Sequence, residues 1–123
     1  MGRGRISSVW HINTSRIEGW LSTLAPRGAE RLIALLGMLA THGPQLGRPY
    51  VGKIVGSRYS NMKELRLTGL EGRQLRVLWC LDSGRHAVML RAGDKTGQWD
   101  SWYSREIPMA DAAFDDYRRT NNE

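Results

Sequence analysis

Three stretches in the second half of the chain alternate apolar and polar residues with a period of two, which is the pattern of a half-buried β-strand. They cover residues 62–67, 73–81 and 85–92. Because successive side chains of a strand point to opposite faces, each stretch predicts one apolar face. The expected apolar residues are Leu65, Leu67, Leu75, Val77, Trp79, Leu81, Val88, Leu90 and Ala92. A three-stranded meander of this kind needs a second layer over its apolar face.

The other face of the expected meander carries charge. It bears Glu64 and Arg66 on the first strand, Arg76 on the second and Arg91 on the third. A guanidinium group is permanently charged, and its planar fork matches the oxygens of a phosphate group. This face therefore indicates a site for RNA phosphates.

Two amphipathic helical segments precede these strands. Ser15 and Glu18 have the spacing of a capping box, which predicts a helix start. Pro26 would end that helix and open the next one, whose apolar residues recur at helical spacing as far as Gly43. The two segments predict a helical hairpin that packs on the apolar face of the sheet.

Weaker signals complete the expected topology. Residues 9–13 alternate weakly and could form a first strand, and residues 50–54 could form a brief extended piece. A last helix is expected to begin at Pro108. The expected fold class is α+β, with an N-terminal strand and helical hairpin packed on a mostly antiparallel sheet and a C-terminal helix. Residues 1–7 and 120–123 are expected to be flexible ends.

The length of 123 residues suits one domain, residues 1–123, and its charge is unevenly distributed. The net charge is +6, and residues 46–95 hold ten Lys and Arg residues against four Asp and Glu residues. A basic block of this kind favours a polyanionic partner. The alternative is a solvated basic face that only aids solubility.

Other features limit the compartment and the cofactors. Cys80 is the one cysteine, which excludes an internal disulfide and suits a reducing cytoplasm. No apolar run approaches the roughly 20 residues of a membrane span, and residues 1–5 are not followed by the apolar segment of a secretory signal. His11, His42 and His86 show no metal-ligand spacing. We therefore expect a cytoplasmic protein that needs no membrane, metal or other cofactor.

The order of elements and several short motifs resemble the RelE/ParE superfamily and, within it, the HigB-like toxins of bacterial and phage toxin–antitoxin pairs. The motifs are Lys63-Glu64-Leu65-Arg66, Leu75-Arg76-Val77-Leu78, Gly93-Asp94-Lys95, Trp99, Trp102-Tyr103 and Ile107-Pro108. The resemblance implies a RelE-like fold and a metal-independent endoribonuclease that cleaves messenger RNA on the ribosome. It also implies a cognate helix-turn-helix antitoxin as partner.

The resemblance points to particular catalytic residues. Cleavage of RNA through its own 2′-hydroxyl needs a proton acceptor, cations for the developing phosphorane charge, and an acid for the leaving oxygen. Arg66, Arg76 and Arg91 could supply the cations, and Arg76 matches the central-strand arginine of the family. Lys95 and Tyr103 lie where relatives carry a basic residue and a tyrosine or histidine.

Two questions about these residues stay open at the level of sequence. Glu64 could serve as the base, or it could form a buried pair that orients Arg76. Trp102 could stack on a base, or it could pack in the core. The residues expected to bind RNA are Lys63, Arg73, Arg91 and Trp102.

Two other function classes compete with the ribonuclease. One is a ParE-like toxin that acts by binding DNA gyrase. The other is a non-catalytic phage-derived domain that binds RNA or a protein. The arginines of the charged face favour RNA cleavage, since they offer charge stabilisation where a phosphate would lie.

Overall fold

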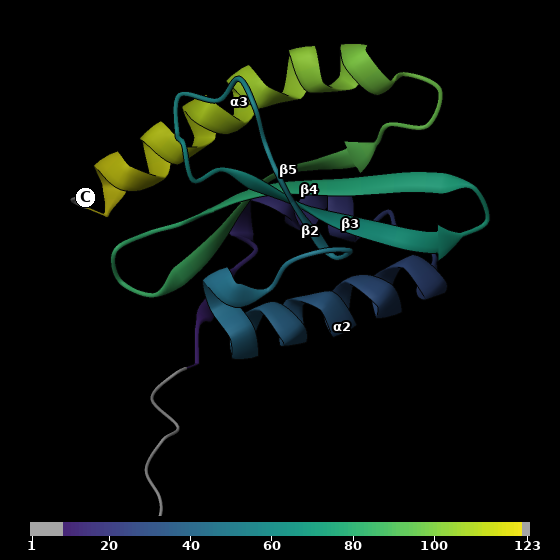
Figure 1. The fold of residues 1–123 in the computed structure, drawn as a ribbon, viewed down its shortest axis with the longest axis horizontal. Coiled ribbons are helices and arrows are strands. Elements are labelled where there is room, and N and C mark those ends of the chain that lie inside the picture. The colour runs from purple at the N-terminus through teal and green to yellow at the C-terminus, as the bar shows by residue number, and fades with distance from the viewer. Residues whose placement is uncertain (1–8, 122–123) are drawn as a thin grey trace, which may run out of the picture.

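The computed structural model describes residues 9–121, which form a three-layer α+β domain (Figure 1). The elements in chain order are β1 (His11–Asn13), the 3₁₀ turn η2 (Ser15–Ile17), α1 (Glu18–Leu21), α2 (Pro26–His42), the 3₁₀ turn η3 (Gly43–Gln45), β2 (Val51–Lys53), β3 (Lys63–Leu70), β4 (Arg73–Leu81), β5 (His86–Asp94) and α3 (Trp99–Thr120). The predicted fold class is confirmed, and the arrangement is consistent with a RelE-like fold.

The five strands form one sheet in the order β1-β5-β4-β3-β2. Only β1 runs parallel to its neighbour, β5, and the other three pairings are antiparallel. Helix α2 covers one face of the sheet and α3 covers the other (Figure 1). The mostly antiparallel sheet is therefore confirmed, and the brief extended piece expected near residue 52 is β2.

Each face of the sheet has its own apolar core. The core on the α2 side includes Leu32, Leu35, Leu39, Leu65, Leu67, Leu75, Val77, Trp79, Ala87 and Met89. The core on the α3 side includes Met62, Leu78, Cys80, Val88, Leu90, Trp102, Ala110, Phe114 and Tyr117. The central strands are thus buried on both faces, as in a sheet between two helical layers.

The prediction that Val88 and Leu90 lie on the same face as Ala92 is wrong. Ala92 packs on the α2 side as expected, whereas Val88 and Leu90 pack on the α3 side. The register between β4 and β5 shifts by one residue between Leu78 and Trp79. A one-residue bulge reverses the facing of every residue beyond it, which explains the difference.

The expected capping box does not form. The Ser15 hydroxyl instead donates to the side-chain oxygen of Asn13 at 2.8 Å, and the Ser15 N–H donates to the same oxygen at 3.0 Å. This local bonding competes with helix capping. The first arm of the predicted hairpin is therefore only η2 followed by the single turn α1, while α2 has the expected start at Pro26.

Helix α3 begins at Trp99, so the prediction that it begins at Pro108 is wrong. Proline lacks the N–H of one intrahelical hydrogen bond, but burial of the apolar stripe against the sheet stabilises the helix on both sides of it. The buried stripe includes Trp102, Ala110, Phe114 and Tyr117. The early start brings the first turns of α3 over the sheet.

The connection between β2 and β3 crosses α3 and is bonded to it (Figure 1). The Ser57 hydroxyl and the Arg58 N–H donate to the two carboxylate oxygens of Asp111 at 2.5 and 3.1 Å. The Arg58 guanidinium and the Tyr59 hydroxyl both bond Asp115. Edge strand β2 is thereby tied to the helix on the α3 side.

The ends of the chain fall largely outside the described residues. Of the segments expected to be flexible, 1–7 and 122–123 lie there, whereas Thr120 still belongs to α3 and Asn121 caps it. Within residues 9–121, no helix combines the length and the apolarity that a membrane crossing requires.

Candidate functional site

A buried carboxylate, Glu64 of β3, lies at the centre of a charged cluster on the α3 side of the sheet. Its side chain is only 5% exposed. One oxygen, Oε1, accepts a hydrogen bond from the Tyr103 hydroxyl of α3 at 2.6 Å, and Oε2 accepts one from Arg66 Nε at 3.0 Å. Arg76 Nε of β4 lies 3.8 Å from Oε1. Two strands and the helix thus meet at one carboxylate.

Strand register explains why the two arginines are neighbours. Arg66 and Arg76 are directly paired across β3 and β4, while Glu64 is paired with Leu78 one step along the same face. Like charges at directly opposite positions repel each other. Glu64 lies diagonally to Arg76 and two residues from Arg66, so its negative charge offsets that repulsion.

Arg76 is almost fully buried, with 7% of its side chain exposed. Its terminal nitrogens donate to the Leu75 carbonyl at 3.0 Å and to Gln74 Oε1 at 3.2 Å. Its Nε has no hydrogen-bond partner within residues 9–121. A buried guanidinium needs paired charge and hydrogen bonds to be stable, so Glu64 and Gln74 together hold this side chain in place.

Lys95 follows β5 and completes the cationic part of the cluster. It is 4% exposed, and its Nζ lies 3.5 Å from the ring centroid of Trp99 and 4.8 Å from that of Tyr103. Burial lowers the pKa of the Lys95 ammonium from its ordinary value, and nearby Arg76 lowers it further, while Glu64 acts in the opposite direction. A lysine of lowered pKa can exchange a proton more readily near neutral pH.

Tyr103 has the opposite tendency. Burial raises the pKa of its phenol to about 12, and the hydrogen bond to Glu64 contributes in the same direction. The phenol is therefore protonated at neutral pH and acts as a hydrogen-bond donor. Of the nine residues predicted for the site, the structure brings together Glu64, Arg66, Arg76, Lys95 and Tyr103.

Two glycines in the strands leave space for neighbouring side chains, and one of them, Gly52, leaves it for Arg66 of the cluster. A Cβ at Gly52 of β2 would lie 2.2 Å from Arg66 Nη2, and a Cβ at Gly93 of β5 would lie 2.8 Å from Trp102 Nε1. The sequence analysis assigned no role to Gly52, Gly93 or Gln74, although Gly93 belongs to the quoted Gly93-Asp94-Lys95 motif. Glycine inside a strand often marks a close approach of another group, so Gly52 within the expected extended piece was a usable signal.

Arg91 and Trp102 are not part of the cluster. Arg91 Nε pairs with Glu106 of α3 at 2.7 Å, and Arg105 bonds the other oxygen of Glu106 at 3.2 Å. Trp102 is 2% exposed and packs in the core on the α3 side. Its ring has no open face for base stacking, so of the two interpretations of Trp102, the structure supports core packing.

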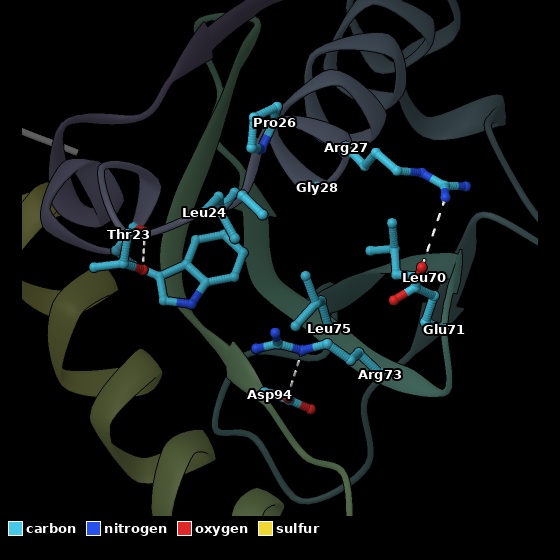
Figure 2. A pocket seen from close by; sticks show the side chains of 12 residues that line it. Thr23, Leu24, Pro26, Arg27, Gly28, Leu70, Glu71, Arg73, Leu75 and Asp94 are labelled. Atoms are coloured by element: carbon cyan, nitrogen blue, oxygen red, sulfur yellow. Dashed lines mark hydrogen bonds and ion pairs between the residues drawn. The ribbon is translucent and has the colours of Figure 1, made fainter.

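Arg73 lies away from the cluster, beside Asp94 and Leu75 (Figure 2). It pairs with Asp94 at 3.1 Å beside a pocket of about 430 Å³ between the start of α2 and the β3–β4 hairpin. Leu24, Leu70 and Leu75 line this pocket. Leu75 belongs to the core on the α2 side, so Arg73 is separated from Glu64 by the sheet. Lys63 is also separate, since it pairs with Lys53 at the edge of the sheet.

Metal-ligating side chains are scattered over the described part of the chain. The ring nitrogen Nδ1 of His86 lies 3.1 Å from the Asp82 carboxylate. Between residues 9 and 121, no three His, Cys, Asp or Glu side chains come together in a way that could hold a metal ion.

The chain belongs to the family of phage-derived Gp49-like proteins (DUF891), whose pattern matches residues 19–115. It is similar to two proteins of Mycobacterium tuberculosis (strain ATCC 25618 / H37Rv). One is named "Putative toxin HigB2", with 42% identity over 106 residues that cover 85% of this chain and 52% of the relative. The other is named "Putative toxin HigB3", with 38% identity over 96 residues that cover 78% and 82%. The chain thus spans about half the length of the first relative. The resemblance to HigB-like proteins is confirmed.

Proposed function

We propose that this protein is the toxin of a type II toxin–antitoxin pair and that the Glu64 cluster cleaves messenger RNA. Two relatives whose names describe them as toxins support the first part. The observation that carries the second part is the convergence of three cations, Arg66, Arg76 and Lys95, on one carboxylate and one neutral phenol. Phosphoryl chemistry needs preorganised positive charge of this kind.

The proposed reaction uses the 2′-oxygen of the RNA as nucleophile. This oxygen forms a bond to phosphorus while the bond from phosphorus to the 5′-oxygen breaks, which leaves a 2′,3′-cyclic phosphate and a 5′-hydroxyl. Arg66 and Arg76 stabilise the added negative charge of the phosphorane. Lys95, in its neutral form, accepts the 2′ proton, and the Tyr103 phenol supplies a proton to the leaving oxygen.

Glu64 is then a positioning residue. Both of its oxygens already accept hydrogen bonds, one from Tyr103 and the other from Arg66. A carboxylate that accepts hydrogen bonds on both oxygens fixes the direction of the groups that donate them. Of the two interpretations left open by the sequence, the contacts support the one in which Glu64 orients the arginine side chains.

Brief induction of the protein in a bacterial host, followed by primer extension on cellular messages, tests the proposal. We expect new 5′ ends within translated messages for the unchanged protein and for the control Arg118→Ala, an exposed arginine at the other end of α3. We expect none for Arg76→Ala. Blocking translation before induction would test whether cleavage requires the ribosome.

Other outcomes would favour the competing classes. Filamentation with DNA-damage signalling and intact messages would indicate a gyrase-binding toxin. Undisturbed growth with a folded protein would indicate a domain without catalytic activity. Either result would contradict the ribonuclease proposal.

The proposed partners are translated messages in the cytoplasm and a cognate helix-turn-helix antitoxin. The basic block of residues 46–95 favours an antitoxin whose contacting segment is acidic, because complementary charge speeds association. Co-expression with the neighbouring gene product should restore growth.

A further inference from the structure

A basic groove runs along the free edge of strand β2, outside the Glu64 cluster. Its volume is about 350 Å³. It is lined by Pro44, Gln45, Leu46, Gly47, Arg48, Val51, Gly52, Lys53 and Lys63. This lining holds three cations and no carboxylate, so the groove is electrostatically suited to an anion.

The three cations of the groove have no carboxylate partner, in contrast to several arginines elsewhere in the described residues. Within residues 9–121, no hydrogen bond or ion pair involves the side chain of Arg48, Lys53 or Lys63. By contrast, Arg73 and Arg91 are each bound to an acidic side chain. The charge of the groove is therefore available to a ligand.

Two of these cations are forced together by the strand register. Lys53 and Lys63 are directly paired across β2 and β3, so their side chains project from the same face at neighbouring positions. Like charges at such positions destabilise a sheet. A bound anion would relieve this repulsion, and that relief would add to its affinity.

The groove adjoins the Glu64 cluster across a single residue. Gly52 lines the groove, and the Arg66 guanidinium lies against the same glycine, since a Cβ there would be 2.2 Å from Arg66 Nη2. Gly52 and Lys53 are consecutive and face opposite sides of the strand. An extended polyanion that passes around the edge of β2 would therefore meet a cation on each face, Arg66 on one and Lys53 on the other.

We propose that a single RNA strand crosses the edge strand β2 in this way, with the phosphates next to the scissile one bound by Arg48, Lys53 and Lys63. The identity of the strand as RNA rests on the proposed function. A phosphodiester chain suits the groove better than an acidic protein segment because the cations continue directly from the Arg66–Arg76 pair, where a phosphate would react. The Tyr50 side chain is available beside this path to stack on a base, since Tyr50 is 39% exposed. Its backbone carbonyl accepts a hydrogen bond from the backbone N–H of Arg66 at 2.8 Å, which fixes its place next to the cluster.

Binding of a short single-stranded RNA carrying 2′-O-methyl groups tests the inference, since this RNA lacks the nucleophile and cannot be cleaved. The double variant Lys53→Gln/Lys63→Gln is compared with Arg118→Gln/Arg119→Gln, which removes the same charge near the end of α3. The two control residues lie roughly 20 Å along the helix from Tyr103. Fluorescence anisotropy at several salt concentrations gives the dissociation constants, and circular dichroism checks the fold.

We expect the groove variant to bind at least tenfold more weakly and to lower the slope of log affinity against log salt by about 1.4, or about 0.7 per lost phosphate contact. The control should change neither quantity by as much. An equal loss of RNA affinity in both double variants would show that only the net charge matters, and it would overturn the proposal. Unchanged binding by the groove variant would overturn it too and would leave the groove for a protein partner. Since binding is measured without cleavage, a failure of the ribonuclease proposal would be seen separately, as absence of cleavage of unmodified RNA.

Discussion

The hydroxyl of Tyr103 donates a 2.6 Å hydrogen bond to Glu64, a residue 39 positions earlier in the chain. This bond joins the second turn of α3 to strand β3 of the sheet. Glu64 in turn holds Arg66 by a 3.0 Å bond from Nε. The position of the helix and the direction of the arginine are therefore coupled through one carboxylate.

Removal of Arg76 should abolish toxicity while preserving the fold. Loss of one preorganised donor to a developing negative charge typically costs about 2.7–4 kcal/mol of transition-state stabilisation, or about 10²–10³ in rate. The measurement is the single-turnover cleavage rate of Arg76→Ala together with its melting temperature. A folded Arg76→Ala protein that cleaves at the normal rate would refute the catalytic assignment, and Arg118→Ala serves as the matched arginine control.

Replacement of Glu64 by glutamine should lower the cleavage rate and the stability but leave RNA affinity nearly unchanged. The amide can still accept the Tyr103 hydrogen bond, but it no longer neutralises the buried Arg76, and an unpaired buried charge costs about 3–5 kcal/mol. Denaturant unfolding, RNA binding and cleavage are measured on Glu64→Gln. Glu30→Gln on the exposed side of α2 provides the control. If Glu64→Gln bound RNA more tightly and kept full stability, Glu64 would instead be a solvated charge.

Addition of one methyl group at Gly52 should act through Arg66. Because the contacting atom is the end of a flexible side chain, Gly52→Ala should fold but displace the guanidinium, with a loss of up to about 100-fold in cleavage rate. Gly37→Ala is the matched control, since a Cβ there meets nothing within 4 Å. In the background of Arg66→Ala the Gly52 change should have no further effect. Additive losses in this double-mutant cycle would show that Gly52 acts on something other than Arg66.

The raised pKa of Tyr103 predicts a loss of stability at alkaline pH. The phenol has a pKa of about 12 in the folded protein and an ordinary value of 10.0. Between these values the folded state retains a proton that the unfolded state has released, so the free energy of unfolding falls as pH rises from about 10 to about 12. The contribution is fully present below pH 10. Denaturant unfolding at a series of pH values should show a smaller fall for Tyr103→Phe, and an identical fall in both proteins would refute the assignment.

Much of the Glu64 cluster was predictable because it follows from strand geometry. Glu64 and Arg66 share a face by the period of two, and the same alternation puts Arg76 on the charged face of the next strand. The direct pairing of Arg76 with Arg66 was not predictable, because it depends on a register shift between Leu67 and Leu70. Lys95 and Tyr103 came from the family resemblance. The contact of Tyr103 with Glu64 depends on the early start of α3, which Pro108 concealed.

It was harder to predict which face of the sheet each side chain of β5 would take. Strands that are buried on both faces have few polar residues to mark which side is which. The bulge at Leu78 and Trp79 therefore left no clear alternation in the run from Ala87 to Leu90. The ion pairs of Arg73 and Arg91 were also hidden, because the end of β5 brings Asp94 to Arg73 and helix α3 brings Glu106 to Arg91.

The connection that bonds Asp111 and Asp115 of α3 has a consequence for how the site opens. A three-residue edge strand such as β2 would ordinarily fray independently of the rest of the sheet. Here the loop that follows it is hydrogen-bonded to the helix that carries Tyr103, so we expect β2 to detach only when α3 also moves away from the sheet. Arg66 contacts Gly52 of β2, and Tyr103 of α3 donates a hydrogen bond to Glu64. We therefore expect both side chains to leave the cluster in the same opening event. Amide hydrogens of β2 should accordingly exchange at the rate of the α3 amides and more slowly than those of a free edge.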